Sequence, residues 1–324
     1  MRSTFRKGLL ASVTALAVSA LLATSTAAAD PGFVPDADDA VGTGSDTTEL
    51  VLNALATSYN ATSPTVRLAS WDAPTLGQPN PPIVLRSGTT AIPRPNGSGA
   101  GITELKRSGT PTNFARSSRA RQATDGATVI FLPFAKDVIN YAVANTTNAA
   151  LNLTAAELKT IFECTATTWS AVRTGLPATT IAPVLPQAGS GTRTTFLASI
   201  GNAVPGSCVV EVQENDPTPI SGNPNRIGPF SAGRFAVLPT PKPIQLNTGG
   251  YSGPRKLYNV VIDTNGGGVL NGGTAAALQP IFGTGNPTAA GVGAGWICGS
   301  AATSVISGQG FTQLTAVEKC GKAE

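Results

Sequence analysis

The sequence predicts an α/β fold with mostly parallel sheets. Short runs of β-branched and aromatic residues alternate with helical patterns along the chain, as they do in strand–helix–strand units. Three loops rich in Gly, Ser and Thr each precede a helical pattern, and no segment repeats at a fixed period. The chain has 324 residues, of which 41% are apolar and 12% charged. It is therefore long enough for one large or two medium domains, and its composition is not that of a disordered protein.

Residues 1–29 have the pattern of a secretory signal peptide. Three basic residues precede a run of small and apolar residues at 8–23, and the alanines at 27–29 come directly before Asp30. This order is typical of a cleaved leader, and the apolar run is too short to cross a membrane. We expect cleavage near Ala29, a mature chain without a membrane span, and a secreted or cell-envelope location, periplasmic or extracellular. No Cys lies near the cleavage site, which excludes a lipid anchor there.

The net charge of the mature chain is close to zero. The whole sequence has 22 Lys and Arg against 18 Asp and Glu, but the leader contains three basic residues and no acidic one. The mature chain therefore has 19 basic residues against 18 acidic ones and gives no reason to expect a nucleic-acid partner. The sequence contains no His, which excludes His-dependent catalytic triads and His metal sites. We expect no cofactor and no bound metal.

The first part of the mature chain is predicted to contain two helices and a strand. Apolar residues from Leu50 to Tyr59 recur at helical spacing, with Asp46 or Thr47 as the expected N-cap. A short helix is predicted over 102–106. A strand end runs into a basic loop over 113–121.

The second part continues the alternation of strands and helices. Thr154 and Glu157 form a capping-box pattern at the start of a helix that reaches Phe162. Another helix is expected through Phe196 and Ile200. The other predicted elements are strands at 129–134, 138–144, 181–185, 234–238 and 257–262 and a helix at 275–282.

Four Cys residues in an exported chain should be oxidised. Of the three ways to pair them, we predict the local one, Cys164–Cys208 and Cys298–Cys320. Four free thiols are the alternative. A zinc site is less favoured, because the spacings are wide and no two Cys form a C-x-x-C motif.

The three Gly/Ser/Thr loops are the main chemical signal. They lie at 42–48, 93–101 and 189–195. The first turn of a helix has free N–H groups, and a loop of this composition lets the backbone approach a bound anion closely. If the three loops converge, they would surround a small oxyanion with neutral donors. The phosphate-loop motif G-x-x-x-x-G-K-[ST] and the hydrolase motif G-x-S-x-G are both absent.

Five segments in this order resemble the phosphate-binding proteins of bacterial phosphate ABC transporters. The segments are 42–48, 97–101, 114–119, 151–169 and 190–196, and the most specific are 151–169 and the S-G-T-R-x-x-F box at 190–196. The resemblance covers nearly the whole mature chain. It implies a type II periplasmic-binding-protein fold, in which two lobes, each a mostly parallel sheet flanked by helices, hold the ligand in the cleft between them.

The resemblance also implies the domain boundaries and the partners. Crossovers near 134–138 and 240–256 would separate lobe 1, residues 36–134 and 248–324, from lobe 2, residues 135–247. Each predicted disulfide then lies within one lobe, as a hinge that must open requires. We expect a monomer that binds inorganic phosphate or a similar oxyanion and docks on an ABC transporter permease.

The residues that match the family's ligand positions come from four segments. They are Ser45, Asp46, Thr47, Ser98, Gly99, Ser117, Ser118, Ser190, Gly191, Thr192 and Arg193.

Three positions depart from the family pattern. The family's Ser-Asp pair falls on Ser117 and Ser118, its Arg on Pro186, and the Asp partner of that Arg on Ala188. The carboxylate that accepts the proton of hydrogen phosphate is therefore missing at its usual position, so selectivity against sulfate is not guaranteed.

Other residues are candidates to replace these groups. Asp46 either replaces the missing acceptor or is a plain helix cap. Arg193 or Arg116 either replaces the lost cation or is a solvated residue. The run Arg116, Arg119 and Arg121 either steers anions to the cleft or is a solvated loop.

The predicted function is an exported solute-binding protein that captures phosphate or a related oxyanion for ABC-type uptake. The alternative is a secreted structural or adhesive protein that kept the fold without phosphate binding, which the missing Asp and Arg motivate. We predict that the protein is not an enzyme, because it has no His and no carboxylate cluster with ligand spacing. Nothing in the sequence marks or excludes a Ser–Lys dyad.

Overall fold

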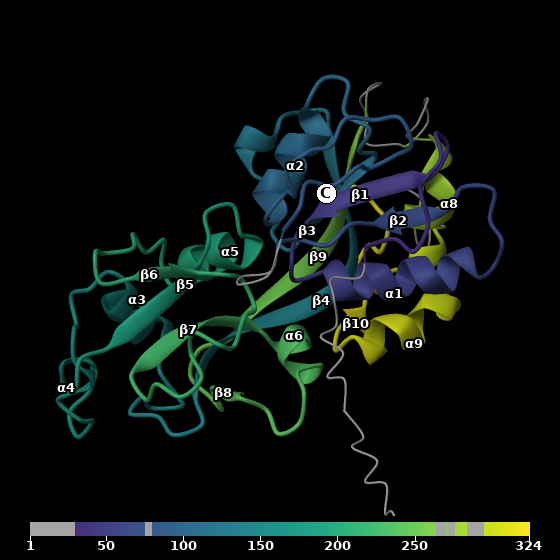
Figure 1. Ribbon diagram of the computed structural model, residues 1–324. Coiled ribbons are helices and arrows are strands. Elements are labelled where there is room, and N and C mark those ends of the chain that lie inside the picture. The colour runs from purple at the N-terminus through teal and green to yellow at the C-terminus, as the bar shows by residue number, and fades with distance from the viewer. Residues whose placement is uncertain (1–29, 75–79, 264–269, 271–275, 284–294) are drawn as a thin grey trace, which may run out of the picture.

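Two lobes are joined by two long strands in the computed structural model (Figure 1). The structure describes residues 30–74, 80–263, 270, 276–283 and 295–324, so the predicted leader lies outside the described residues. Strands β4 (Val129–Ala144) and β9 (Gly253–Ile262) pair antiparallel and run from one lobe into the other. The lobes therefore share one continuous sheet.

The described strands follow the order β2-β1-β3-β9-β4-β7-β5-β6, with β8 and β10 also paired to β4. Within the lobes, β1 pairs parallel with β2 and β3, and β5 pairs parallel with β6 and β7. Every pairing made by β4 and β9 is antiparallel. The bounds are β1 Ala40–Gly44, β2 Leu68–Ser70, β3 Phe114–Ser117, β5 Ala182–Pro186, β6 Val210–Val212, β7 Arg226–Ser231, β8 Ile244–Leu246 and β10 Thr312–Gln313.

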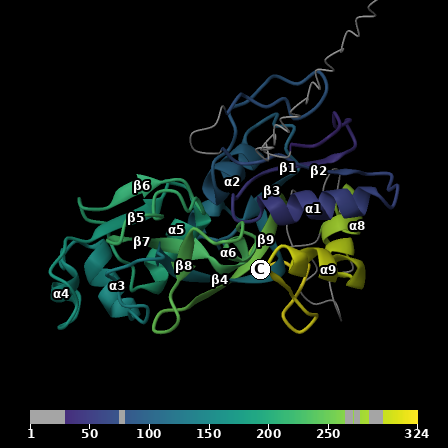
Figure 2. The ribbon, with the colours of Figure 1, turned by 60° about the horizontal axis from the view of Figure 1, so that its bottom comes forward.

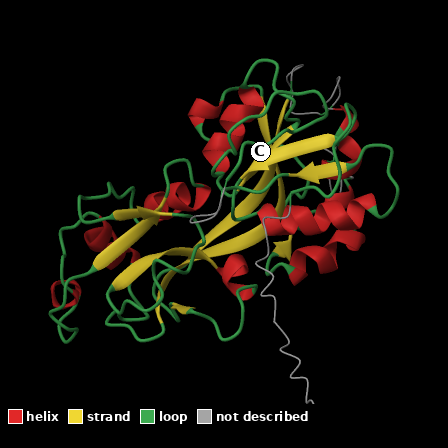
Figure 3. Ribbon diagram, in the orientation of Figure 1, coloured by secondary structure: helices red, strands yellow, loops and turns green. Residues whose placement is uncertain are grey.

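Helices cover the sheet separately in each lobe, as the two views in Figures 1 and 2 and the red ribbons in Figure 3 show. Lobe 1 contains α1 Glu49–Asn60, α2 Ser98–Lys106, α8 Gln279–Phe282 and α9 Ser300–Gly308, and lobe 2 contains α3 Ala155–Phe162, α4 Trp169–Val172, α5 Gly191–Ser199 and α6 Ala232–Ala236. Among the described residues, no helix has the length and apolar character needed to cross a membrane.

Each lobe has its own apolar core. In lobe 1, Phe114 packs edge-on against Phe282 with ring centroids 4.9 Å apart. In lobe 2, Phe162 packs edge-on against Phe196, also at 4.9 Å, and Trp169 is fully buried beside them. The apolar cores of the two lobes are therefore separate, and the paired strands β4 and β9 connect the lobes.

Of the two helix N-caps predicted from the sequence, one is confirmed and the other is wrong. The capping box is confirmed: the Thr154 hydroxyl accepts from Glu157 N at 3.2 Å, and the Glu157 carboxylate accepts from Thr154 N at 2.7 Å. The predicted cap of α1 is wrong. Its N-cap is Thr48, which makes no side-chain capping bond. The side chains of Asp46 and Thr47 therefore have partners outside the helix.

Two predicted strands are corrected. Residues 129–144 form one strand, because residues 135–137 keep pairing with β9 after a register shift at Pro133. Residues 234–238 contain the end of helix α6, not a strand. This helix is capped by the Ser231 hydroxyl, which accepts from Arg234 N at 3.2 Å. Of the predicted helix at 275–282, the structure has α8 at Gln279–Phe282, and residue 275 lies outside the described residues.

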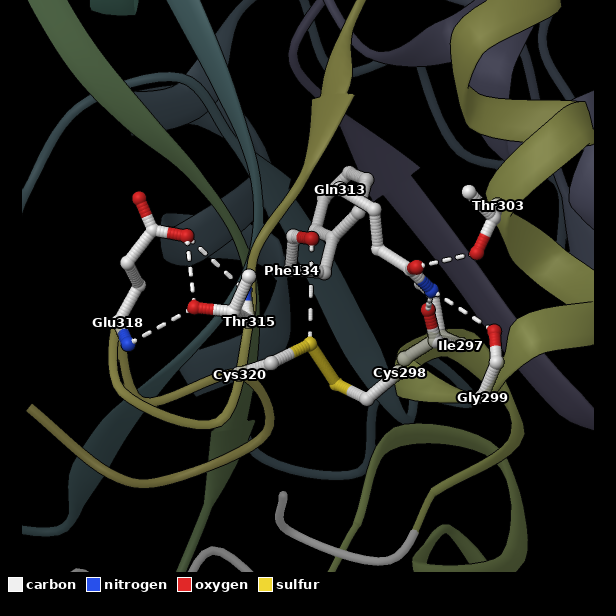
Figure 4. The surroundings of a disulfide bond; sticks show 9 residues. All are labelled: Phe134, Ile297, Cys298, Gly299, Thr303, Gln313, Thr315, Glu318 and Cys320. Atoms are coloured by element: carbon white, nitrogen blue, oxygen red, sulfur yellow. Dashed lines mark hydrogen bonds between the residues drawn. A yellow bond between two sulfur atoms is a disulfide. The ribbon is translucent and has the colours of Figure 1, made fainter. Parts of the chain in front are cut away.

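Both predicted disulfides, Cys164–Cys208 and Cys298–Cys320, are present. Figure 4 shows that Cys320 Sγ lies against the carbonyl oxygen of Phe134, at 3.9 Å. The chain around Cys320 follows β4, because Leu314 N donates to Phe134 O at 2.9 Å and Gly321 N donates to Pro133 O at 2.8 Å. The disulfide therefore ties the C-terminal segment to residues 296–298, and the backbone hydrogen bonds tie the same segment to the lobe 1 half of β4.

Replacing Cys298 and Cys320 together by Ala should lower the free energy of unfolding by about 3 kcal/mol, because the bond closes a loop with a sequence separation of 22 residues. Urea denaturation of both proteins under oxidising conditions measures the difference. A loss below about 1 kcal/mol would show that the hydrogen bonds along β4 hold the segment without the covalent link.

Candidate functional site

The loops at the inner ends of the two lobes are in direct contact. Gly99 N, in lobe 1, donates to the carbonyl oxygen of Gly189, in lobe 2, at 2.9 Å. A Cβ atom at Gly97, whose φ is +93°, would lie 2.8 Å from the same oxygen. Only Gly allows the backbones to approach this closely with that conformation. The glycine loops before α2 and α5 therefore converge, and the cleft is closed.

Two Thr hydroxyls meet across the cleft. Thr47, which precedes α1, and Thr192, in the first turn of α5, have their Oγ1 atoms 3.2 Å apart. Both hydroxyls donate to one oxygen of Glu214, Oε1, from Thr47 at 2.7 Å and from Thr192 at 2.5 Å. We call Thr47 and Thr192 the bridging threonines. They are fully buried, and Glu214 is 1% exposed.

Arg255, on the hinge strand β9, also contacts both bridging threonines. Arg255 Nη1 donates to Thr192 Oγ1 at 2.8 Å, and Nη2 donates to Thr47 Oγ1 at 3.3 Å. The same guanidinium donates through Nε and Nη2 to one oxygen of Asp137, at 2.9 and 2.7 Å. Asp137 and Arg255 are register partners on β4 and β9. The hinge strands therefore hold the cation between the lobes.

Two Ser hydroxyls of lobe 1 lie against the start of α5. Ser98 Oγ accepts from Ser118 N at 3.0 Å and lies 3.4 Å from Ser118 Oγ. A Cβ atom at Gly191 would lie 2.4 Å from both hydroxyl oxygens. The structure thus brings Ser98, Ser118 and Gly191 together, at a helix N-terminus that favours an anion.

The hydroxyls of Ser117 and Ser190 form hydrogen bonds with nearby backbone groups of their own segments. Ser117 Oγ donates to the carbonyl oxygen of Arg119 at 2.8 Å, and Ser190 Oγ caps α5 by accepting from Arg193 N at 3.0 Å. Ser45 N donates to Arg116 O at 3.1 Å, and Ser45 Oγ is buried with no hydrogen-bond partner.

The arginines predicted to serve the cleft have other hydrogen-bond partners. Arg193 donates to Pro186 O at 2.9 Å and to exposed Glu211 at 3.1 Å. Arg116 is fully buried and donates to Ser70 Oγ and to backbone oxygens, and Arg119 forms an ion pair with Asp125. Arg116 and Arg119 are both buried, so they do not form a steering surface, whereas Arg121 is exposed and donates to Gly126 O at 2.7 Å. Each of these arginines has its partners within its own lobe, and a contact of Arg193 with a ligand stays a prediction.

The residues missed by the sequence analysis come from the hinge and from one loop of lobe 2. Asp137 and Arg255 lie in the two predicted crossovers, so a search for charged residues there would have found both. Glu214, Asn215 and Arg234 had no such signal: the first two lie in a long polar loop, and the third lies in a segment predicted to be a strand.

Buried carboxyl groups lie beside the bridging threonines. Asp46 Oδ1 accepts from Asn215 Nδ2 at 2.8 Å, and Glu49 accepts from Arg234 of lobe 2 at 3.3 Å. Burial, followed by the charge of Glu49, raises the pKa of Asp46 well above its ordinary value. Burial also raises the pKa of Glu49, although Arg234 acts in the opposite direction. Asp46 is therefore a weak candidate for an acceptor, since its raised pKa favours the protonated form.

Residues 25–314 match the family described as the PBP superfamily domain. The chain belongs to the PBP superfamily. Its predicted two-lobed type II periplasmic-binding-protein fold is confirmed by that match and by solved structures that are similar over most of their length. No curated protein sequence matches the chain.

Three solved structures illustrate the similarity to PBP superfamily proteins. An ABC-type phosphate transport receptor from Vibrio cholerae is 19% identical, has a TM-score of 0.56, and is matched over 83% of this chain and 98% of its own. A phosphate ABC transporter substrate-binding protein with bound phosphate from Clostridium perfringens is 16% identical, with a TM-score of 0.59 and coverage of 84% and 98%. A phosphate-binding protein from Stenotrophomonas maltophilia is 14% identical, with a TM-score of 0.52 and coverage of 86% and 91%. At these identities the similarity establishes the fold.

Replacing Asp137 by Asn should lower the free energy of unfolding by about 3 kcal/mol, because it leaves Arg255 buried without its counter-charge. The matched control is Lys136→Gln on the same strand. Its ion pair with Glu318 is exposed, so this change should cost less than about 1 kcal/mol. Urea denaturation compares the two variants with the wild type, and equal losses would contradict a special role for the hinge pair.

Replacing Asp46 by Asn should stabilise the protein more at pH 7 than at pH 4. Between the ordinary carboxyl pKa and the raised pKa of Asp46, the folded protein keeps a proton that the unfolded chain releases. The free energy of unfolding therefore falls as pH rises through this range. Asn stays neutral and keeps the oxygen that accepts from Asn215. Thermal unfolding of both proteins at the two pH values measures the effect, and a gain that does not grow with pH would contradict it.

Proposed function

We propose that the protein is an exported solute-binding protein that captures phosphate or a related oxyanion in the interlobe cleft and delivers it to an ABC transporter permease. The observation that carries the proposal is the meeting of Thr47 and Thr192, from opposite lobes, at 3.2 Å beside Arg255. The pattern of residues 1–29 supports export. The similarity to a phosphate transport receptor and to a substrate-binding protein with bound phosphate supports the ligand class.

The donors around the cleft fit an oxyanion. Ser98 and Ser118 of lobe 1 and Thr192 of lobe 2 provide neutral hydroxyls at the start of α5. Arg255, whose charge is paired with Asp137, donates to the hydroxyls of Thr47 and Thr192. A hydrogen bond to a charged group contributes about 1.5–3 kcal/mol, so a few of them give tight binding. Because the donors come from both lobes, a ligand that contacts them all would favour closure. We propose that the protein binds the anion without turnover.

The hydrogen-bond acceptors in the cleft determine the selectivity that we expect between phosphate and sulfate. Hydrogen phosphate has a proton to donate and sulfate has none. Ser118 stands where the resembling family has an acceptor carboxylate, and the raised pKa of Asp46 makes it a poor substitute. We therefore propose an oxyanion receptor that binds sulfate as well as phosphate.

One observation favours the alternative, a secreted structural or adhesive protein. The bridging threonines already donate to a protein carboxylate, Glu214, so their hydrogen bonds are made without any ligand. In that case the function would lie on the outer surface of the lobes.

Calorimetry separates these candidates. The mature protein, residues 30–324, is unfolded and refolded to remove bound ligand and then titrated with phosphate, sulfate and arsenate at pH 7. We expect dissociation constants of about micromolar or tighter for phosphate. The absence of heat with all three anions would contradict the proposal and favour the structural alternative. Phosphate binding with no sulfate binding would contradict the proposed lack of selectivity.

Replacing Ser118 by Ala should weaken phosphate binding about tenfold, since it removes one hydroxyl donor to a charged ligand. The matched control is Ser117→Ala, the adjacent residue, whose hydroxyl donates to Arg119 O within its own loop. This control should leave the dissociation constant unchanged. The same calorimetric titration measures both variants, and equal effects would place the ligand away from Ser118.

A further inference from the structure

The carboxylate of Glu214 lies where the bridging threonines would hold an oxygen of a bound anion. Its Oε1 accepts from Thr47 at 2.7 Å and from Thr192 at 2.5 Å, and the residue is 1% exposed. We propose that Glu214 is a tethered stand-in for the oxyanion: it holds the cleft closed without ligand, and it must leave the bridging threonines when a ligand binds. This inference rests on the proposed function.

The loop that carries Glu214 is built to reach across the cleft. It follows β6 in lobe 2, and three consecutive side chains contact lobe 1. The Gln213 side chain exchanges hydrogen bonds with Asn96 at 3.1 Å, and Asn215 Nδ2 donates to Asp46 at 2.8 Å. Between them, Glu214 N donates to Gln187 Oε1 at 2.8 Å, which holds the backbone in place. The carboxylate is therefore positioned by its neighbours on both sides.

The hydrogen bonds of Glu214 imitate those of a ligand only in part. One carboxylate oxygen has two hydroxyl donors, but the other, Oε2, is buried with no hydrogen-bond partner. An unsatisfied buried acceptor is unfavourable. A tetrahedral oxyanion has more acceptor oxygens with which to use the surrounding hydroxyls and N–H groups. A free oxyanion can therefore displace Glu214, although it competes with a group that is always present at high effective concentration.

The negative charges make it unfavourable for the Glu214 carboxylate and an oxyanion to occupy the site together. Glu214 lies close enough to Asp46 for its charge to raise the pKa of that group. A bound oxyanion would share the same donors with Glu214 and would add a further negative charge in a closed, buried site. Like charges that lie close together repel strongly in a low-dielectric environment. The ligand and Glu214 therefore exclude each other, and Glu214 sets how tightly the cleft binds.

The first test is calorimetry with Glu214→Gln, which removes the charge and keeps the size. Phosphate should bind at least about tenfold more tightly than to the wild type, because the competing anion is gone. The matched control is Glu211→Gln, the same change three residues earlier, where the carboxylate is exposed and pairs with Arg193. This control should bind as the wild type does.

The outcomes separate this inference from the proposed function. If neither the wild type nor Glu214→Gln binds phosphate, sulfate or arsenate, the proposed function fails. If both bind phosphate equally, the stand-in role is overturned. It is also overturned if Glu214→Gln binds phosphate more weakly, because Glu214 would then be a contact of the ligand.

The second test measures closure, and the comparison made without anion does not depend on binding. Small-angle scattering of the refolded protein without anion should show the wild type and Glu211→Ala at the same compact radius of gyration. Glu214→Ala, which lacks the acceptor for the bridging threonines, should have a larger radius that shrinks when phosphate is added. A Glu214→Ala protein as compact as the wild type without anion would overturn the proposed role in closure.

Discussion

A single chain of hydrogen bonds joins the two lobes through the hinge. It runs from Asp137 to Arg255, from Arg255 to the bridging threonines, and from these to Glu214. All the residues in this chain are buried, so each one depends on its neighbour in the chain for a hydrogen-bond partner or a counter-charge. Together with the contacts of Gly99 with Gly189, of Gln213 with Asn96 and of Asn215 with Asp46, this chain holds the loops of the two lobes against each other.

The hinge determines where that chain can form. Because β4 and β9 run through both lobes, Arg255 on β9 donates to hydroxyls from either lobe, those of Thr47 and Thr192. Each disulfide joins residues of a single lobe, and the one at Cys298 and Cys320 joins the C-terminal segment to residues 296–298 of lobe 1. Neither of these covalent links crosses from one lobe to the other.

The charge of the cleft differs from what the resemblance implied. The acceptor carboxylate is absent at Ser118 and the cation at Pro186, while a cation on the hinge and a carboxylate from the opposite lobe lie within reach of the same hydroxyls. Buried acids at Asp46 and Glu49 have raised pKa values, so protonation limits the negative charge that accumulates there. The cleft contains hydroxyls and the N-terminus of α5, with charged groups contributed by the hinge strands and by the loop that carries Glu214.

The sequence by itself determined the α/β class, the capping box at Thr154, the disulfide pairs and the positions of the glycine loops, because each depends on neighbouring residues, on spacing or on composition. It did not determine the continuity of β4, which follows from pairing with β9, or the partners of Arg116 and Arg193, which lie within their own lobes. Only the tertiary structure decided that Arg255, Asp137 and Glu214 share the site with Thr47. Their contacts join residues more than a hundred positions apart, as with the 167 between Thr47 and Glu214. No local pattern encodes such a contact, because it exists only when the lobes pack against each other.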